Sequence, residues 1–442
     1  MFDALFTTTT EYKKLSHALS GKGACALFGL PASGRAQVYA ALCRQLDKPL
    51  CIVTPGEAEA TRFAADLNTL GIPAAVFPAR DYVLRPIEGT AREYEYRRLA
   101  VLGELVGGRL RAVAVPAEAL TQFTTPKEDF CANTRALHAG DTLLRDDLFG
   151  AGYTRRAQVD GPGQFSVRGD IVDIFAPDQK MPVRMEFWGD EIDTLHTFDL
   201  TTQRREDAID KFYLSPAREV LFGKPADAAE QLQAFLAKQR GKKKTAMADC
   251  MAADLDLLDG GAVPVNMDKY LAVRYPHPAT VLDYFDDPIL VAEEPASIRE
   301  ADRATVYRRG EELKSLILDG VLCAGLDNLY ADPSYLWSKT GHYRTICAEN
   351  FARSMPDQPL KDIINAPAHT LPAWNGEVAG LLEDLKPLCD AGYTVTLLAG
   401  TDRAAAGLAR DLRDKGILVT TDAAAAPAAG LVQVLAGHLS AG

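Results

Sequence analysis

Short apolar runs alternate with helical patterns in the N-terminal part of the chain, and this alternation constrains the possible fold. The expected strands are Ala24–Phe28, Leu50–Thr54, Ala74–Phe77 and Arg111–Val115, and the expected helices are Ala36–Gln45, Glu57–Leu70 and Ala91–Val106. Short buried strands separated by amphipathic helices are typical of β-α-β units with parallel strands and right-handed crossovers. The sequence therefore predicts an α/β domain built around a parallel sheet.

A glycine loop follows the first expected strand. Gly29 and Gly34 have the spacing of a nucleotide-binding phosphate loop, but Arg35 and Ala36 follow them where that loop has Lys and then Ser or Thr. The lysine binds the terminal phosphates and the hydroxyl ligates magnesium, whereas Ala36 has no atom that binds a metal. We expect a degenerate loop without hydrolysis. Weak anion binding by backbone N–H groups at a helix N-terminus stays open.

An acidic pair later in the chain supports the same interpretation. The expected strand Pro288–Ala292 is followed by Glu293 and Glu294, where a nucleotide-hydrolysing sheet carries a magnesium-coordinating Asp and a catalytic Glu. The first acidic position is occupied by Ala292. The pair is either a degenerate acidic motif or a strand end with solvated glutamates. We predict no catalytic residue, no metal site and no cofactor in this chain.

Composition limits the other classes of function. The net charge of −12 argues against broad electrostatic binding to nucleic acid, and the run Lys242–Lys244 is interpreted as a solvated loop, with a local basic patch as the alternative. No run of about twenty apolar residues and no secretion signal is present, so we expect no membrane contact and a cytoplasmic location. The eight cysteines lack C-x-x-C spacing and are expected to be reduced.

The pattern of strands and turns divides the chain into a degenerate P-loop-like α/β domain, a mostly antiparallel β insert and a small separate α/β domain. The expected boundaries are 1–123 and 218–355 for the α/β domain, 124–217 for the insert and 356–442 for the small domain. The insert is predicted from strands at Gln164–Arg168, Ile171–Phe175, Val183–Phe187 and Ile192–Phe198. A proline-rich linker is expected at Pro356–Pro372.

The insert carries the most specific motifs of the chain. Residues Gly152–Arg156, Gln164–Pro177 and Arg184–Asp193, together with Phe77–Tyr82, resemble the family that comprises UvrB and the transcription-repair coupling factors. The resemblance covers most of residues 1–350 and is specific to that pair of relatives. It implies a UvrB-like fold and a role in nucleotide excision repair.

Two departures separate the two branches of this family. UvrB has an intact nucleotide loop and an aromatic β-hairpin that clamps damaged DNA, whereas here Tyr82–Glu88 leads directly into a helix expected near Thr90. The chain is therefore more similar to the N-terminal module of the coupling factors, with 356–442 as their small third domain. The resemblance implies that domains contacting RNA polymerase and DNA, and the motor domains that use ATP and magnesium, lie outside these residues.

The resemblance also implies a docking function. In the family the β insert binds UvrA, and by position the arginines of that contact are Arg155 and Arg168, with Arg156 beside them. Phe165 and Phe175 are expected to form the apolar centre of the surface. The alternative is that Phe175 is a core residue and that Arg155 and Arg156 only flank an exposed sheet face. Where UvrB has a further arginine, this chain has Ser166.

Two classes of function therefore remain open at this stage. The first is a non-enzymatic adaptor that holds UvrA. The second is a nucleotide-dependent enzyme, either a UvrB-like loader at DNA damage or an unrelated ATPase that uses Arg35 in place of lysine. Ala36 and Ala292 argue against the second class because neither side chain can hold the magnesium ion.

Overall fold

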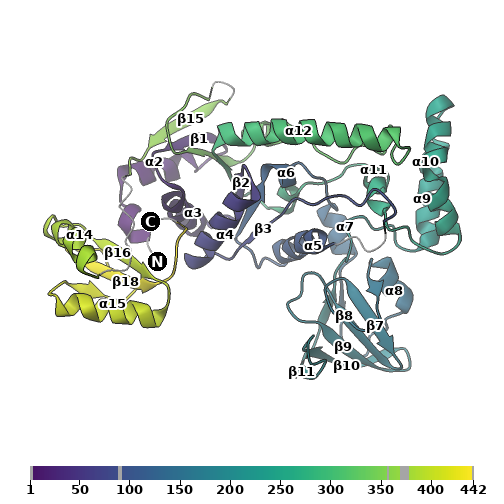
Figure 1. The fold of residues 1–442 in the computed structure, drawn as a ribbon, viewed down its shortest axis with the longest axis horizontal. Coiled ribbons are helices and arrows are strands. Elements are labelled where there is room, and N and C mark those ends of the chain that lie inside the picture. The colour runs from purple at the N-terminus through teal and green to yellow at the C-terminus, as the bar shows by residue number, and fades with distance from the viewer. Residues whose placement is uncertain (1–2, 88–91, 356–357, 369–377, 441–442) are drawn as a thin grey trace.

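The computed structural model describes residues 3–87, 92–355, 358–368 and 378–440. Figure 1 shows a central sheet domain, a β-rich insert that projects from it, a pair of helices at the opposite end from the termini, and a small C-terminal unit beside the N-terminus. Within these ranges, no helix is long and apolar enough to cross a membrane.

The central domain is a parallel sheet of seven strands in the order β15-β1-β14-β13-β2-β4-β3. The strands are β1 (Gly23–Phe28), β2 (Leu50–Thr54), β3 (Ala74–Val76), β4 (Ala112–Pro116), β13 (Ile289–Glu293), β14 (Arg344–Glu349) and β15 (Leu360–Asn365). Alternate residues of one strand enter different cores: Cys25 packs on one face of the sheet and Ala26 on the other. The predicted parallel α/β domain is confirmed.

Helices cover both faces of this sheet. One core contains residues of α2 (Thr10–Ala18), α3 (Ala32–Leu46) and α4 (Glu57–Thr69), and the other contains residues of α5 (Glu93–Val106) and the start of α12 (Pro295–Leu318). The expected start of the α5 helix near Thr90 lies outside the described residues. Strands buried on both faces explain the nearly continuous apolar runs in the sequence.

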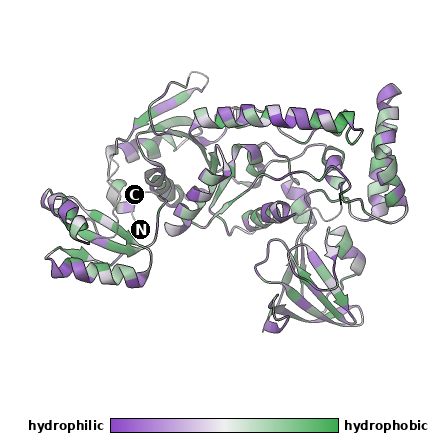
Figure 2. Ribbon diagram, in the orientation of Figure 1, coloured by the Kyte–Doolittle hydropathy of each residue, from purple (hydrophilic) through white to green (hydrophobic). Residues whose placement is uncertain are grey.

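The insert is a six-stranded sheet in the order β11-β10-β9-β8-β7-β6. Its strands are β6 (Thr154–Arg155), β7 (Gln164–Arg168), β8 (Ile171–Phe175), β9 (Val183–Trp188), β10 (Glu191–Phe198) and β11 (Arg205–Ala208), and only β6 and β7 pair in parallel. β5 (Arg135–Leu137) pairs with β12 (Phe212–Leu214) and brings the two ends of the insert together. Apolar and polar residues alternate along the strands in Figure 2.

A helical subdomain follows the insert. It contains α9 (Pro225–Ala237), α10 (Gly241–Asp259) and α11 (Leu271–Arg274) around a separate apolar core. The run Lys242–Lys244 was expected to form a loop, but it lies exposed in the first turn of α10. Lysine has good helix propensity, and the run therefore begins a helix that the charge pattern alone does not reveal.

The C-terminal unit is a three-stranded parallel sheet in the order β16-β18-β17, with α14 (Val378–Asp390) and α15 (Asp402–Asp414). Its strands are β16 (Val395–Ala399), β17 (Val419–Thr420) and β18 (Val432–Ala436). The boundary expected at residue 356 is wrong, because β15 pairs with β1 as the edge strand of the central sheet. Parts of the expected linker, residues 356–357 and 369–372, lie outside the described residues.

Candidate docking surface and altered nucleotide site

The glycine loop differs from a phosphate loop in its backbone. Helix α3 begins at Ala32 after Pro31, whose φ of −65° suits a helix start, so Gly34 lies inside the helix and not in the loop. Gly29 does adopt the left-handed region, with φ +91°. The expectation that the helix begins at Ala36 is therefore wrong, because α3 begins at Ala32 and includes the second glycine of the motif.

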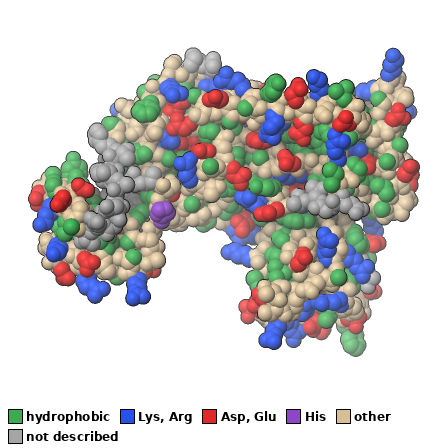
Figure 3. All heavy atoms as spheres, in the orientation of Figure 1, with side chains coloured by type: hydrophobic (Ala, Val, Ile, Leu, Met, Phe, Trp, Pro, Cys, Tyr) green, Lys and Arg blue, Asp and Glu red, His purple; other side chains and the backbone are tan. Residues whose placement is uncertain are grey.

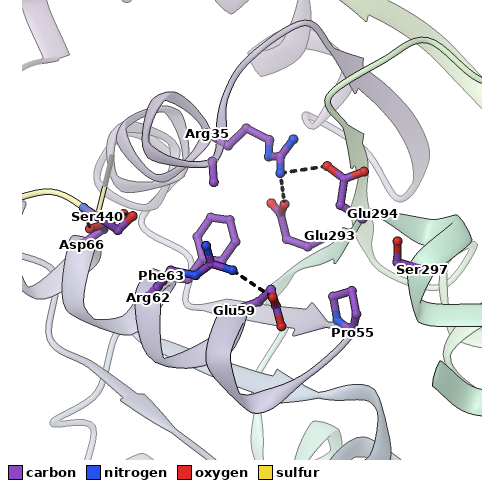
Figure 4. Close-up of a pocket in the computed structure, with 11 residues that line it drawn as sticks. Arg35, Pro55, Glu59, Arg62, Phe63, Asp66, Glu293, Glu294, Ser297 and Ser440 are labelled. Atoms are coloured by element: carbon purple, nitrogen blue, oxygen red, sulfur yellow. Dashed lines mark hydrogen bonds and ion pairs between the residues drawn. The ribbon is translucent and has the colours of Figure 1, made fainter. Parts of the chain in front are cut away.

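The charged groups of the altered site bind one another. Arg35 Nη2 lies 2.9 Å from Glu293 Oε2 and 3.0 Å from Glu294 Oε1, as Figure 4 shows. The Tyr39 hydroxyl donates a hydrogen bond of 2.5 Å to the other oxygen of Glu293. Arg35 Nη1 donates to the carbonyl of Leu30 at 3.2 Å. The cation that would meet a phosphate is already paired with two carboxylates.

A cavity of about 320 Å³ adjoins this ion pair and is lined on its other sides by α4 and by Ser440 from the C-terminal segment. Glu293 is 1% exposed, so the alternative of a fully solvated acidic pair is wrong for this residue. Burial raises the pKa of Glu293 to about 7, although Arg35 and the hydrogen bond from Tyr39 act in the opposite direction. Acidic groups around the cavity disfavour a nucleotide phosphate.

The remaining residues of the loop do not supply a metal site. Ala36 is fully buried in the core beneath the sheet. Among the described residues, no group of three or more His, Cys, Asp and Glu side chains is placed to hold a metal ion. What the arrangement can do is hold α3 against the end of β13 through a buried ion pair.

The two phenylalanines proposed for the docking surface are core residues. Phe165 is 0% exposed and Phe175 is 8% exposed, and each packs in an apolar cluster of the insert. The prediction that they form the exposed apolar centre is therefore wrong. Side chains of a strand alternate between faces, and the register of β7 and β8 directs Phe165 inward together with Ile174.

Arg168 lies on the opposite, polar face of the insert, where an aspartate orients it. Its Nη2 donates a hydrogen bond of 2.5 Å to Oδ2 of Asp173, which is fully buried. Arg184 binds the same carboxylate through Nε at 2.6 Å and Nη2 at 3.0 Å. The Arg168 side chain remains half-exposed and is held at one end by this pair. It is thus positioned to meet a partner with little loss of side-chain entropy.

The structure does not bring Arg155 and Arg168 together on one face. Arg155 is in register with Phe165, and it lines a cleft beside the insert that Arg168 does not reach. Arg156 is the next residue along the chain and is exposed. Figure 3 shows Lys and Arg side chains interspersed with Asp and Glu on the visible face of the insert.

Trp188 is a candidate that reasoning from the sequence missed. It is 86% exposed at the end of β9, and strand alternation places it on the same face as Arg184. The backbone N–H of the preceding residue, Phe187, donates a hydrogen bond of 2.8 Å to the carbonyl of Asp170. Trp188 therefore lies next to the turn that follows Arg168. An aromatic residue directly before the Gly189-Asp190 turn was the available signal. We call Arg168 and Trp188 the polar-face group.

Comparison with known proteins identifies the class of the insert first. Residues 137–220 match the family model described as the UvrB interaction domain. Residues 137–220, which include the strands of the insert, are therefore similar to a UvrB interaction domain, and they lie within a parallel α/β domain.

The matches to whole proteins are more particular. The transcription-repair-coupling factor of Bacillus subtilis is 25% identical over 432 residues, which cover 94% of this chain and 36% of that protein. The factor of Myxococcus xanthus is 35% identical over 208 residues, 44% of this chain and 17% of the relative. The UvrABC system protein B of Chlorobium limicola is 24% identical over 327 residues, 66% of this chain and 48% of the relative.

Over nearly its whole length, the chain is homologous to the N-terminal region of transcription-repair-coupling factors, and it also shares homology with UvrB. The chain spans only about 36% of the length of the coupling factor that it matches.

Proposed function

We propose that this chain is a non-enzymatic adaptor module that recruits UvrA to a transcription-repair-coupling factor. The match of residues 137–220 to the UvrB interaction domain carries this proposal. The pairing of Arg35 with Glu293 and Glu294 supports the absence of ATPase activity, because carboxylates occupy the surroundings of the only loop cation. We infer no catalytic residue and no cofactor for these residues.

We propose the polar-face group as the main contact with UvrA. Trp188 supplies a large exposed apolar surface, and tryptophan and arginine are the residue types that most often dominate binding energy at interfaces. Arg168 offers charge-assisted hydrogen bonds to a carboxylate and is already oriented by Asp173. The buried Phe165 supports the sheet from beneath, whereas Phe175 packs with Val159 and Phe198 on the face that carries Asp173.

Calorimetric titration of purified UvrA into this chain tests the proposal. We expect Trp188→Ala and Arg168→Ala each to weaken binding by about 2 kcal/mol or more, as is usual for interface hot spots. Tyr307→Ala is the matched control, because Tyr307 is an equally exposed aromatic residue, 75% exposed, on α12 of the central domain. Failure of the wild-type chain to bind UvrA would refute the adaptor function, and unchanged binding by both variants would refute the polar-face group.

The complete protein would extend this role. We propose that domains outside this chain contact RNA polymerase and DNA, use ATP and magnesium to translocate, and remove stalled polymerase so that excision repair follows. The match to the UvrABC system protein B favours a second candidate, a nucleotide-dependent loader at DNA damage. The self-paired charges at Arg35 argue against this candidate.

A further inference from the structure

A cleft of about 810 Å³ separates the insert from the helical subdomain. One wall comes from α8 (Arg145–Gly150) and β6 of the insert, and the other from α9, the end of α10 and the loop that follows it. The cleft is far larger than the cavity beside Arg35, and neither the nucleotide site nor the polar-face group uses it.

Arginines with spare donors line this cleft. Arg218 donates from Nε to the carbonyl of Gly152 at 3.3 Å, and its two terminal nitrogens have no partner among the residues that the structure describes. Burial, and then the positive charge of Arg92, lower the pKa of Arg218, while the nearby Glu95 and Asp268 act in the opposite direction without an ion pair to it. Arg155, which also lines the cleft, makes no ion pair within the described ranges. A carboxylate entering here would meet unpaired guanidinium groups.

Arg92, which also lines the cleft, has hydrogen-bond partners for its terminal nitrogens. Its Nη1 lies 2.6 Å from Glu95 Oε2, and its Nη2 donates to the carbonyl of Val265 at 2.6 Å. Arg92 is therefore part of the framework, and the available charge comes from Arg155 and Arg218. Arg155 and Arg218 are therefore candidates for binding a ligand, whereas Arg92 stabilises the fold.

Apolar side chains stand beside these arginines. Phe149 and Val263 face the cleft from opposite walls and are each about half exposed. The Phe149 ring is fixed by edge-to-face contact with Phe165, at a centroid distance of 5.2 Å. Unpaired arginines next to exposed apolar groups suit a chain segment that carries both carboxylates and an apolar side chain.

The charge of the cleft favours a peptide over a nucleic acid. Asp146 and Asp259 also line it, and acidic groups would repel a continuous phosphate backbone. An acidic peptide can place its few carboxylates at the arginines and avoid these aspartates.

We propose that this cleft binds an extended acidic segment of the protein that docks on the insert, which is UvrA if the proposed function holds. Arg155 belongs to the matched interaction domain and opens into the cleft, so the second contact is continuous with that domain. The partner would then touch the insert on two sides. It would also bridge the insert to the helical subdomain.

Titration of UvrA into cleft variants of the full chain tests this inference. We expect Arg218→Gln and Val263→Glu to weaken binding at least about tenfold, the first by loss of a charged donor and the second by repulsion of carboxylates. Asp259→Asn should instead tighten binding a few-fold, because it removes a repelling charge from an exposed position. A purely structural role of the cleft would not produce effects of opposite sign. Val263 and Asp259 are both exposed, so their variants keep the test valid should Arg218→Gln misfold.

The outcomes separate this inference from the proposed function. Binding that is weakened by Trp188→Ala but unchanged in all three cleft variants would overturn the cleft and leave the adaptor intact. Absence of wild-type binding would overturn both. A fluorescent single-stranded DNA 12-mer serves as the second probe: tight binding that Arg218→Gln abolishes would overturn the assignment to an acidic peptide.

Discussion

Glu293 occupies the position of an acidic residue in a nucleotide-hydrolysing sheet, but here its side chain is buried and paired. Its carboxylate lies at the end of β13 with an arginine on one oxygen and a tyrosine hydroxyl on the other. Burial nevertheless raises its pKa to about 7 from the ordinary value of 4.5. The folded protein therefore holds a proton at mildly acidic pH that the unfolded chain releases.

This proton makes stability depend on pH in a definite direction. Between pH 4.5 and 7, a rise in pH increasingly favours the unfolded state. The free energy of unfolding of the wild type should therefore fall relative to that of Glu293→Gln, by up to about 3 kcal/mol. Above pH 7 this difference should level off. Urea denaturation of both proteins at several pH values measures this difference. Tyr39→Phe keeps the carboxylate but removes a hydrogen bond that lowers its pKa, so the pH dependence should persist and extend to higher pH. Parallel curves for wild type and Glu293→Gln would contradict the raised pKa.

At the scale of elements, the junction of β1, α3 and β13 determines what the glycine loop can do. The helix starts at Ala32, Gly34 is helical, and Ala36 points into the core. This site therefore differs from a nucleotide-binding site in its backbone conformation and side-chain packing, and also in its residue types. Replacing the two altered residues alone would leave the carboxylates of Glu293 and Glu294 in place.

We therefore expect the double variant Arg35→Lys, Ala36→Thr to remain unable to bind Mg-ATP. Threonine would also place a hydroxyl at a fully buried position, which should lower stability by about 1–3 kcal/mol. Calorimetric titration with Mg-ATP checks the first expectation, and circular dichroism during urea denaturation checks the second. Micromolar Mg-ATP binding by the variant would show that residue type alone had inactivated the loop.

At the scale of the whole molecule, a buried network of charges ties the insert to its neighbours. Glu219, directly after the insert, accepts from Arg98 of α5 at 2.6 Å and lies 3.2 Å from Arg80, which follows β3. Arg80 in turn binds Asp268 of the helical subdomain at 2.7 Å. Glu95 accepts from the backbone N–H of Glu219 at 2.9 Å. Three parts of the chain thus share one set of ion pairs.

Removing the shared carboxylate should destabilise the molecule strongly. Glu219→Ala leaves Arg98 and Arg80 buried without their common partner, and such a loss costs about 3–5 kcal/mol. Asp319→Ala is the control, because it breaks an ion pair with Arg85 that is largely exposed and should cost about 1 kcal/mol or less. Urea denaturation followed by circular dichroism compares the two. Equal effects would mean that the buried network contributes no more than a surface pair.

Local periodicity predicted many of the strands. The strands that the pattern predicted lie within one or two residues of the expected ranges, as for β2 (Leu50–Thr54) and β8 (Ile171–Phe175), whereas β14 and β15 of the central sheet were not predicted. The reason is that burial on one or both faces of a strand imposes a short-range pattern on neighbouring residues. The two alanines at positions 36 and 292 also indicated, without any structure, that the loop had lost its metal-binding groups.

Contacts between distant segments required the tertiary structure. The pairing of β15 with β1, the ion pair of Arg35 with Glu293 and the separation of Arg155 from Arg168 all depend on which segments pack together. Phe165 and Trp188 are both aromatic residues on insert strands, yet one is buried and the other is exposed. The sequence by itself determined many of the strands, the class of fold and the altered loop. Only packing decided which side chains face the core, which pair with one another, and which remain available to a partner.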